Sequence, residues 1–216
     1  MSINLHDISE HFATSGGKPI GINRAYSVLM PFIEKDGRVF LLLEKRASDM
    51  EDAPGEICFP GGQMEEGETP TEAAIRETEE ELGIGRERIE IIGKPSVLYT
   101  ISSSVIHVVP GIVDCDPDKD VTLNPSEVEE VFLAPLDFFV SNPPYIHKSI
   151  LEADRTDFPY ELAGIDESYP WAKGRAEVPV YNALPDGKIV WGLTANIIRH
   201  FVMDLLSQEE GSSSEE

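Results

Sequence analysis

The chain has 216 residues, of which 41% are hydrophobic and 26% charged, the composition of a soluble globular protein. Its 40 acidic and 17 basic residues give a formal net charge of −23, which argues against nucleic acid as a partner, because a phosphate backbone is bound through Lys and Arg. The longest apolar stretches are too short to span a membrane, and residues 1–12 lack the pattern of a secretory signal. We therefore expect a cytoplasmic protein without membrane attachment.

Hydrophobic periodicity and turn residues divide the chain into short elements. In chain order, the predicted elements are a helix over 4–13 with a glycine-rich exit at 15–17, strands over 25–34 and 38–45, a loop over 47–60, a helix over 70–82, strands over 89–92, 96–100, 105–113, 128–133, 178–181 and 188–191, and a helix over 194–206. Asp36-Gly37 between the first two strands predicts a hairpin.

Strands dominate the first two thirds of the chain, with one helix in the middle and one at the end. The expected fold class is therefore α/β (α+β) with a mixed sheet. We expect a single domain over residues 1–207, in which 141–177 follow no period and form an insertion or a lid. The Ser/Glu-rich tail over 208–216 is expected to be disordered. Cys58 and Cys115 lie in apolar runs and are expected to be buried thiols rather than disulfide partners or ligands.

The helix over 70–82 has well-marked ends. Thr69 can cap it, Pro70 suits its first position, and Glu72 completes a capping box. Gly83 supplies the stop.

This helix concentrates carboxylates in one patch. Glu77 and Glu81 are four residues apart and share a face, and Arg76 and Glu80 form a second such pair beside it. The like charges repel one another, and a hard cation such as Mg²⁺, which prefers carboxylate oxygen, would remove that penalty.

The competing interpretation is that a glutamate-rich helix is simply a solvated face. Three features favour a metal site instead. Arg76 lies among the acids and can orient them, Gly61-Gly62 upstream lets the backbone approach a ligand closely, and Glu68 adds an acid in the loop before the helix.

Residues 62–84 resemble the Nudix box. The matching positions are Gly62, Glu68, Arg76, Glu77, Glu80, Glu81, Gly83 and Ile84. Thr78 departs from the pattern, since an aliphatic residue is usual there. The resemblance implies the Nudix fold, a mixed β-sheet between helices with a loop–helix–loop at the box.

The resemblance also implies roles for these residues. Glu77, Glu80 and Glu81 would bind Mg²⁺ or Mn²⁺, with the carbonyl oxygen of Gly62 as a further ligand, while Arg76 and Glu68 would orient the acids. The reaction implied is attack of a metal-activated water on a phosphorus of a diphosphate. Glu127 is our candidate for a further catalytic acid, ahead of Glu129 and Glu130, and the alternative for Glu127 is a solvated acidic loop.

A second resemblance concerns the substrate. The signature before the box is similar to that of the coenzyme A pyrophosphatases at Leu42, Leu43, Arg46, Gly55, Phe59, Pro60, Gly61 and Gly62, and residues 189–195 resemble the stretch before the last helix of those enzymes. Three positions differ: Glu44 replaces Thr, Ala47 replaces Ser, and Glu51 replaces Arg. This resemblance implies cleavage of CoA or acyl-CoA into 3′,5′-ADP and (acyl-)4′-phosphopantetheine.

Four residues of this signature are candidates for substrate binding. Arg46 could contact a phosphate, although a surface ion pair is equally common for such an arginine, and Gly61 and Gly62 would let the ligand approach the backbone. Phe59 could stack on a base, with core packing as the preferred interpretation, as it is for Trp191.

Other functions stay open at this point. The enzyme could hydrolyse ADP-ribose or another nucleoside diphosphate derivative, because the box is shared by all such enzymes. A Nudix domain that binds a nucleotide or a protein without hydrolysis is an alternative of another class, although such domains typically lack acids that this box retains. The expected partner is a small nucleotide substrate, and a homodimer is compatible with the sequence.

Overall fold

The computed structural model describes residues 4–14, 19–182 and 184–212. The main sheet has eight strands: β1 (Arg24–Lys35), β2 (Arg38–Arg46), β3 (Ile57–Cys58), β4 (Gly61–Gln63), β5 (Ile89–Ile91), β6 (Ser96–Tyr99), β7 (Ser104–Val113) and β8 (Val128–Pro135). The second sheet has three: β9 (Tyr145–Leu151), β10 (Gly174–Tyr181) and β11 (Val190–Trp191). The helices are α1 (Leu5–Thr14), α2 (Pro70–Leu82), α3 (Pro117–Asp120), α4 (Leu136–Ser141), α5 (Tyr160–Ala163) and α6 (Gly192–Ser212), with a 3₁₀ turn, η1 (Arg86–Arg88).

The main sheet is mixed, as the sequence predicts. β1 and β2 form the expected antiparallel hairpin, with Lys35 opposite Arg38, and β1 also pairs in parallel with β7. β4 pairs with the beginning of β1, opposite Tyr26 to Val28. β1 is therefore bonded to a neighbour along its whole length, and the box residues in β4 are fixed to the centre of the fold.

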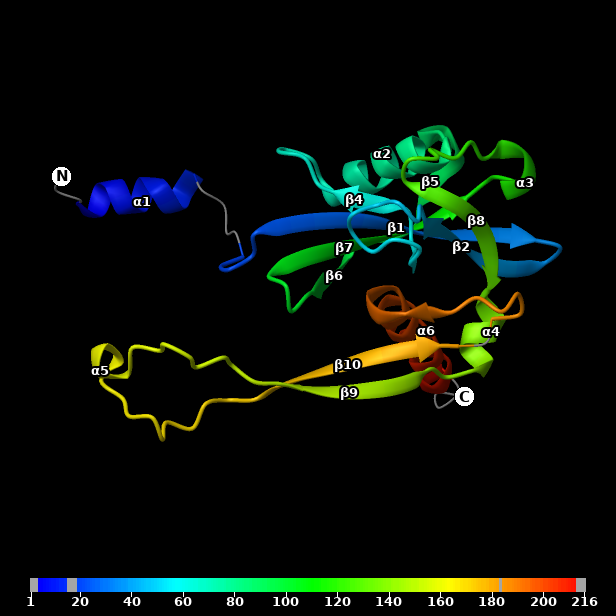
Figure 1. The fold of residues 1–216 in the computed structure, drawn as a ribbon. Helices are drawn as coiled ribbons and strands as arrows, with labels where there is room; N and C mark the ends of the chain where they lie inside the picture. The colour runs from blue at the N-terminus through cyan, green and yellow to red at the C-terminus, as the bar shows by residue number, and fades with distance from the viewer. Residues whose placement is uncertain (1–3, 15–18, 183, 213–216) are drawn as a thin grey trace.

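Helices cover both faces of the main sheet, and α2 and α6 lie on opposite sides of it (Figure 1). Successive residues of β2 point to opposite faces, so Leu42 joins the core under α2 with Ala74 and Leu82, while Leu41 joins the core under α6 with Ile198. The chain thus forms two hydrophobic layers, and α2 rests on one of them with its acidic residues near the end of β2.

Residues 141–177, for which the sequence predicts no element, contain most of a long antiparallel ladder. β9 and β10 pair from Tyr145 with Val180 to Leu151 with Gly174, and residues 152–173, which include α5, join them. We call β9, β10 and this connection the arm, and Figure 1 shows that it extends away from the main sheet. Within the described part of the chain, no helix combines the length and apolar character needed to cross a bilayer.

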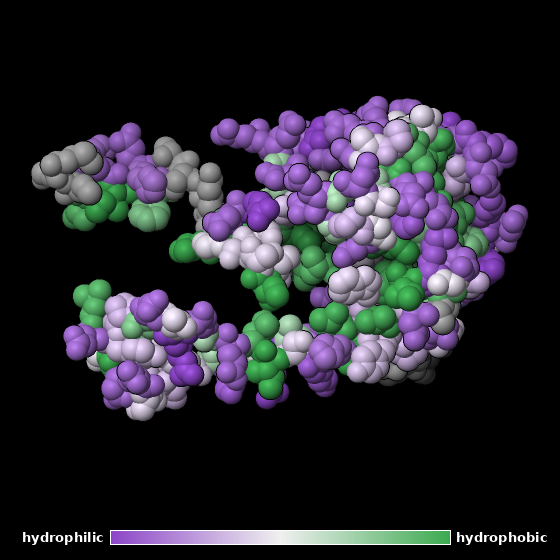
Figure 2. All heavy atoms as spheres, in the orientation of Figure 1, coloured by the Kyte–Doolittle hydropathy of each residue, from purple (hydrophilic) through white to green (hydrophobic). Residues whose placement is uncertain are grey.

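The two ends of the chain differ from expectation in part. α1 forms over nearly the predicted residues, but the apolar side chains of Leu5 and Phe12 are 84% and 74% exposed. Figure 2 shows hydrophobic residues on one side of α1. The glycine-rich exit at 15–17 lies outside the described residues. The last helix begins two residues earlier than predicted and continues to Ser212, so residues 208–212 of the expected disordered tail are helical, while 213–216 are not described.

Trp191 differs from expectation, and the two cysteines form no disulfide with each other. Trp191 is 47% exposed, so the interpretation as a core residue is wrong, because it lies on a two-residue edge strand. Cys58 and Cys115 are free thiols and half-buried, without a disulfide between them.

Candidate active site

The box helix begins and ends where its sequence indicates. The side chain of Thr69 accepts a hydrogen bond from the backbone N–H of Glu72, and the carboxylate of Glu72 accepts one from the N–H of Thr69, which completes the capping box. Gly83 ends the helix in the left-handed conformation at φ 67°. The hydroxyl of Ser27 on β1 donates a 2.6 Å hydrogen bond to the carbonyl oxygen of Pro70 and fixes the start of the helix to the sheet.

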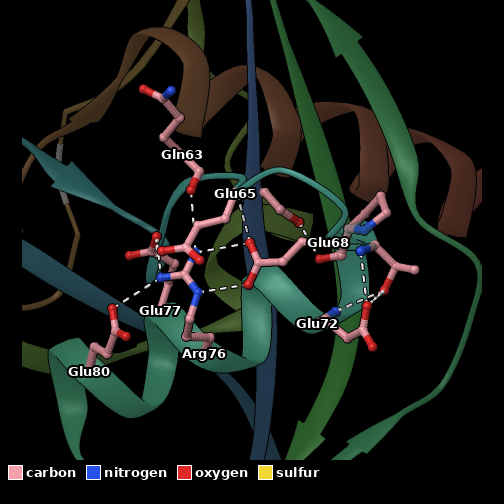
Figure 3. Close-up of polar contacts among 10 residues, drawn as sticks. Gln63, Glu65, Glu68, Glu72, Arg76, Glu77 and Glu80 are labelled. Carbon is pink, nitrogen blue, oxygen red and sulfur yellow. Dashed lines mark hydrogen bonds and ion pairs between the residues drawn. The ribbon is translucent and has the colours of Figure 1, made fainter.

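Arg76 holds three of the box carboxylates (Figure 3). Its Nε and Nη2 donate to the two oxygens of Glu68 at 2.7 and 3.1 Å, and its Nη1 donates to Glu77 at 2.9 Å and to Glu80 at 3.0 Å. These hydrogen bonds hold the pKa of Glu68 at about 2. The guanidinium fork therefore gives Glu77 and Glu80 fixed orientations, the role that the box resemblance implies for Arg76.

Glu81 is buried on the inner side of the helix. Its side chain is 3% exposed, and its Oε2 accepts a 2.8 Å hydrogen bond from the backbone N–H of Gly61. Burial raises the pKa of Glu81 to about 9, and the neighbouring charge of Glu44 adds to the effect. Burial also raises the pKa of Glu77. The folded chain thus holds carboxylates where their charged forms are disfavoured unless a cation is present.

Gly61 and Gly62 are required by close contacts. Gly61 has φ 152°, and a Cβ atom there would lie 2.4 Å from the carbonyl oxygen of Ser27. A Cβ atom on Gly62 would lie 2.5 Å from the carboxylate oxygens of Glu77. The backbone of β4 therefore runs directly against the acidic face of α2.

One open cavity, with a volume of about 660 Å³, brings most of the predicted site together. Among the sequence-predicted residues, those that line this cavity are Arg46, Phe59, Gly61, Gly62, Glu77, Glu81 and Glu127. Arg76 and Glu80 do not line it, and the side chain of Glu80 is 55% exposed. The cavity is therefore bordered by residues from the box, the upstream signature and the loop before β8.

The end of α2 positions Glu127. The N–H groups of Thr122 and Asn124 donate 2.8 Å hydrogen bonds to the carbonyl oxygens of Leu82 and Glu81, and the N–H of Ala47 donates to the carbonyl oxygen of Glu127 at 2.8 Å. The loop that carries Glu127 is thereby tied both to the helix and to the end of β2.

The two other acids of this segment are engaged elsewhere. Glu129 pairs with Lys45 at 2.6 Å, and Glu130 pairs with Lys188 at 3.0 Å. Neither of them lines the cavity, whereas Glu127 does.

Arg46 and Phe59, two signature residues that line the cavity, have different surroundings. The Nε of Arg46 donates to the carbonyl oxygen of Asp52 at 3.3 Å. Arg46 also lines the cavity, where the remaining N–H groups of its guanidinium can donate to a ligand. Phe59 is 2% exposed and packs in the core under α6. Stacking on a base would require its ring to leave that core, so the core interpretation describes Phe59.

Several cavity residues carry no signal in the box or the signature. They are Arg24 and Tyr26 at the beginning of β1, Thr100 and Ser102 in the turn before β7, and Ser104 at the first position of β7. Leu193 at the start of α6, which belongs to the stretch 189–195, lines the cavity as well. The hydroxyl oxygens of Thr100, Ser102 and Ser104 lie within 2.9–3.0 Å of one another. The pairings of β1 with β4 and with β7 bring the beginning of β1 and the turn before β7 beside the box, and these pairings between distant segments are not visible in a single sequence.

Glu44 is the other residue that sequence reasoning missed. Its side chain is completely buried, one carboxylate oxygen accepts from the thiol of Cys58 at 3.4 Å, and the other has no hydrogen-bond partner. Burial raises the pKa of Glu44 to about 7. In the sequence it is visible only as a departure from the signature.

The acidic residues fit a hard divalent cation in their chemistry. The helix and its neighbours present carboxylate oxygens, and the unfavourable burial of Glu81 is the kind of cost that a cation relieves. Among the described residues, no three side chains of the metal-ligating types converge on one point.

Comparison with known proteins identifies the family. The NUDIX domain pattern matches residues 23–152, which is more than half of the chain. Nudix hydrolase 3 of Caenorhabditis elegans is 32% identical over 194 residues, covering 87% of this chain and 75% of that protein. The peroxisomal coenzyme A diphosphatase NUDT7 of Mus musculus is 33% identical over 131 residues, covering 60% of this chain and 55% of that protein. A C. elegans Ap4A hydrolase structure, 22% identical, covers 54% of this chain and 83% of its own with a TM-score of 0.46.

The mixed sheet and a box that retains all its acids define a hydrolase that acts on pyrophosphate bonds. The chain belongs to the Nudix family. Nudix hydrolases generally require a divalent metal ion, and the carboxylates around α2 are the residues of this chain suited to hold one.

Proposed function

We propose that this Nudix hydrolase cleaves the pyrophosphate bond of coenzyme A or an acyl-CoA, releasing 3′,5′-ADP and (acyl-)4′-phosphopantetheine. The observation that carries the proposal is that Arg46, Gly61 and Gly62, which belong to the CoA-type signature, line the same cavity as Glu77 and Glu81 of the box. The likeness to the mouse coenzyme A diphosphatase supports the same substrate class.

The proposed metal ligands are Glu77, Glu80 and Glu81, with the carbonyl oxygen of Gly62. A bound Mg²⁺ or Mn²⁺ would supply polarisation of the phosphoryl oxygens and neutralise charge on the leaving phosphate. Arg76 keeps Glu77 and Glu80 in position through its hydrogen bonds, and Gly61 does the same for Glu81.

We propose Glu127 as the group that accepts a proton from the attacking water. It lines the cavity together with Glu77 and Glu81 of the box, while the neighbouring Glu129 and Glu130 are held in ion pairs. The water oxygen forms a bond to phosphorus, the bridging P–O bond breaks, and Glu127 takes the proton that the water loses.

Arg46 and Arg24 are the basic side chains on the wall of this cavity, and we propose that they contact the phosphates of the substrate. Both lie at strand ends, Arg46 at the end of β2 and Arg24 at the beginning of β1. Such positions suit contacts with the oxygen atoms of a diphosphate, because the guanidinium group can donate two hydrogen bonds at once.

One observation favours a second candidate, ADP-ribose or another nucleoside diphosphate derivative. Glu51 stands where the CoA-type signature has Arg, and Asp52 next to it lines the cavity. These acids reduce the positive charge available to the additional 3′-phosphate of CoA, which ADP-ribose lacks.

A product assay tests the proposal. Purified protein would be given CoA, acetyl-CoA, ADP-ribose, NADH and diadenosine polyphosphates in parallel, with Mg²⁺ or Mn²⁺, and the Glu81→Gln variant would serve as the control. Release of 3′,5′-ADP from CoA by the wild type but not by the variant is the expected result. Preferred cleavage of another substrate would overturn the CoA assignment and leave the pyrophosphohydrolase in place.

A further inference from the structure

Glu44 is a buried carboxylate that the box does not include. It lies on β2 two residues after Leu42, and residues two apart in a strand point to the same face of the sheet. Leu42 packs with Ala74 and Leu82 of α2. The side chain of Glu44 therefore points to the face that α2 covers, where Glu81, the residue before Leu82, is also buried.

Three neighbours place Glu44 directly behind the wall of the active-site cavity. Its backbone is paired with Cys58 on β3 and with Val131 on β8, and its Oε1 accepts the hydrogen bond from the Cys58 thiol. Cys58 itself lines the cavity together with Glu77, Glu81 and Glu127. Of the neighbouring charges that raise the pKa of Glu81, that of Glu44 has the largest effect.

The second oxygen of Glu44 is the unexplained feature. Oε2 is buried, and it has no hydrogen-bond partner. A buried polar atom without a partner costs about 1–3 kcal/mol, and more when the group is charged. The position does not demand a carboxylate, since the signature that this chain resembles has Thr there. A buried acid with one free oxygen beside other acids is explained if that oxygen meets a cation.

We propose that Glu44 is a further ligand of the divalent-cation site and supplies its unpaired carboxylate oxygen beside Glu81. The inference rests on the proposed metal-dependent function and adds to it a carboxylate that lies outside the box. Cys58 holds the other oxygen of Glu44, so the thiol orients the carboxylate toward the helix. The cation site then joins β2 to α2, rather than belonging to the box alone.

Cation binding without nucleotide tests this proposal. The affinity of the full chain for Mn²⁺ would be measured by electron paramagnetic resonance of the free ion for four proteins: the wild type, Glu44→Gln, Glu44→Thr and Glu79→Gln. Glu79→Gln is the matched control, because Glu79 is an exposed glutamate of α2, the helix that carries Glu81, and does not line the cavity. Gln keeps the size of Glu44 and its ability to accept from Cys58, while Thr restores the usual residue of the signature.

We expect the dissociation constant for Mn²⁺ to rise at least about tenfold in both Glu44 variants. In Glu79→Gln it should stay within about twofold, because loss of an exposed charge on the other side of the helix is a weak, screened effect. Melting temperatures in the presence of EDTA supply a second measurement. The Glu44→Gln variant should melt at or above the wild-type temperature without metal, and Mn²⁺ should raise its melting temperature less than that of the wild type.

Three results would overturn the inference. If the Glu44 variants bind Mn²⁺ as tightly as the wild type, Glu44 is not a ligand, and a melting temperature that falls only without metal would mark it as a structural residue. If the wild type itself binds no divalent cation, both this inference and the metal-dependent function are overturned. The two failures are distinguishable because the wild type is measured first and alone.

Discussion

The backbone N–H of Gly61 donates a 2.8 Å hydrogen bond to Oε2 of Glu81, twenty residues further along the chain. This bond joins the first residue of β4 to the last turn of α2. The close approach depends on the absence of a side chain at Gly61, where a Cβ atom would meet the backbone of β1. The orientation of the most deeply buried acid of the box is thus set by the glycine that opens β4.

Replacement of Glu81 by Gln should abolish most of the activity. We expect kcat/KM to fall by about a hundredfold or more, because the neutral amide cannot hold a cation or balance its charge. The fold should be retained or stabilised, since Gln removes a buried carboxylate whose pKa is raised to about 9. Steady-state kinetics and thermal melting check this, and Glu79→Gln should retain near wild-type activity. A Glu81→Gln enzyme within threefold of the wild type would contradict the role of Glu81.

Gly61→Ala should mainly lower the stability of the fold, whereas Gly62→Ala should mainly lower activity. The new Cβ at Gly61 meets main-chain atoms of Ser27 and Val28, so the variant should lose about 2 kcal/mol or more of the free energy of unfolding. At Gly62 the new Cβ meets the carboxylate of Glu77, a flexible group that can move away. That variant should lose activity with a much smaller change in stability. Urea unfolding measures the stability of both variants, and steady-state kinetics measure their activity. An equal loss of stability in the two variants would contradict this prediction.

Arg76→Lys should lower kcat although the charge is kept. A lysine ammonium cannot reproduce the fork that contacts Glu68 through two nitrogen atoms while also contacting Glu77 and Glu80. We expect a fall of about tenfold or more in kcat. Arg86→Lys serves as a comparison, because Arg86 lies near the same helix but outside the cavity. Equal kinetics for Arg76→Lys and the wild type would show that the fork does not orient the acids.

Stability without metal should fall as the pH rises. The pKa of Glu81 is raised from its ordinary value of 4.5 to about 9 by burial, so the folded state binds this proton more tightly than the unfolded state. The stabilisation is complete below about pH 4.5 and is lost as the pH rises toward 9. In EDTA the melting temperature should fall by at least about 4 °C between pH 6 and pH 9.

The same experiment has an internal control. Glu81→Gln has no proton to lose at this position, so its melting temperature should change less over the same pH range. Identical pH profiles for the two proteins would show that Glu81 does not carry the effect.

Local signals in the sequence predicted the bounds of the box helix, α2, well. The cap, the first-position proline and the terminal glycine give the bounds of α2, because each of these signals acts within a few residues. The hairpin of β1 and β2 followed from Asp36-Gly37 in the same way, since the turn geometry is set by the two residues themselves. The fold class followed from the order of such elements.

The remaining features depend on contacts between distant segments. β9 is largely exposed on both faces, so it carries no alternation of polar and apolar residues that could have marked it as a strand. β3 and β4 have two and three residues, and only their pairing with β2 and β1 makes them strands. Glu44 looked like a substitution in a signature, and its burial beside Glu81 became visible only when β2 and α2 were placed together.

The parallel pairing of β1 with β7 has a consequence for how the protein is made. Ser27 lies opposite His107, and the intervening chain includes the whole of α2. On the ribosome, α2 emerges before β7, the strand that pairs with β1. Pairing between such distant segments is slow. The nascent chain therefore contains α2 before the main sheet on which it packs is complete. The enzyme can become active only after most of the domain has been synthesised.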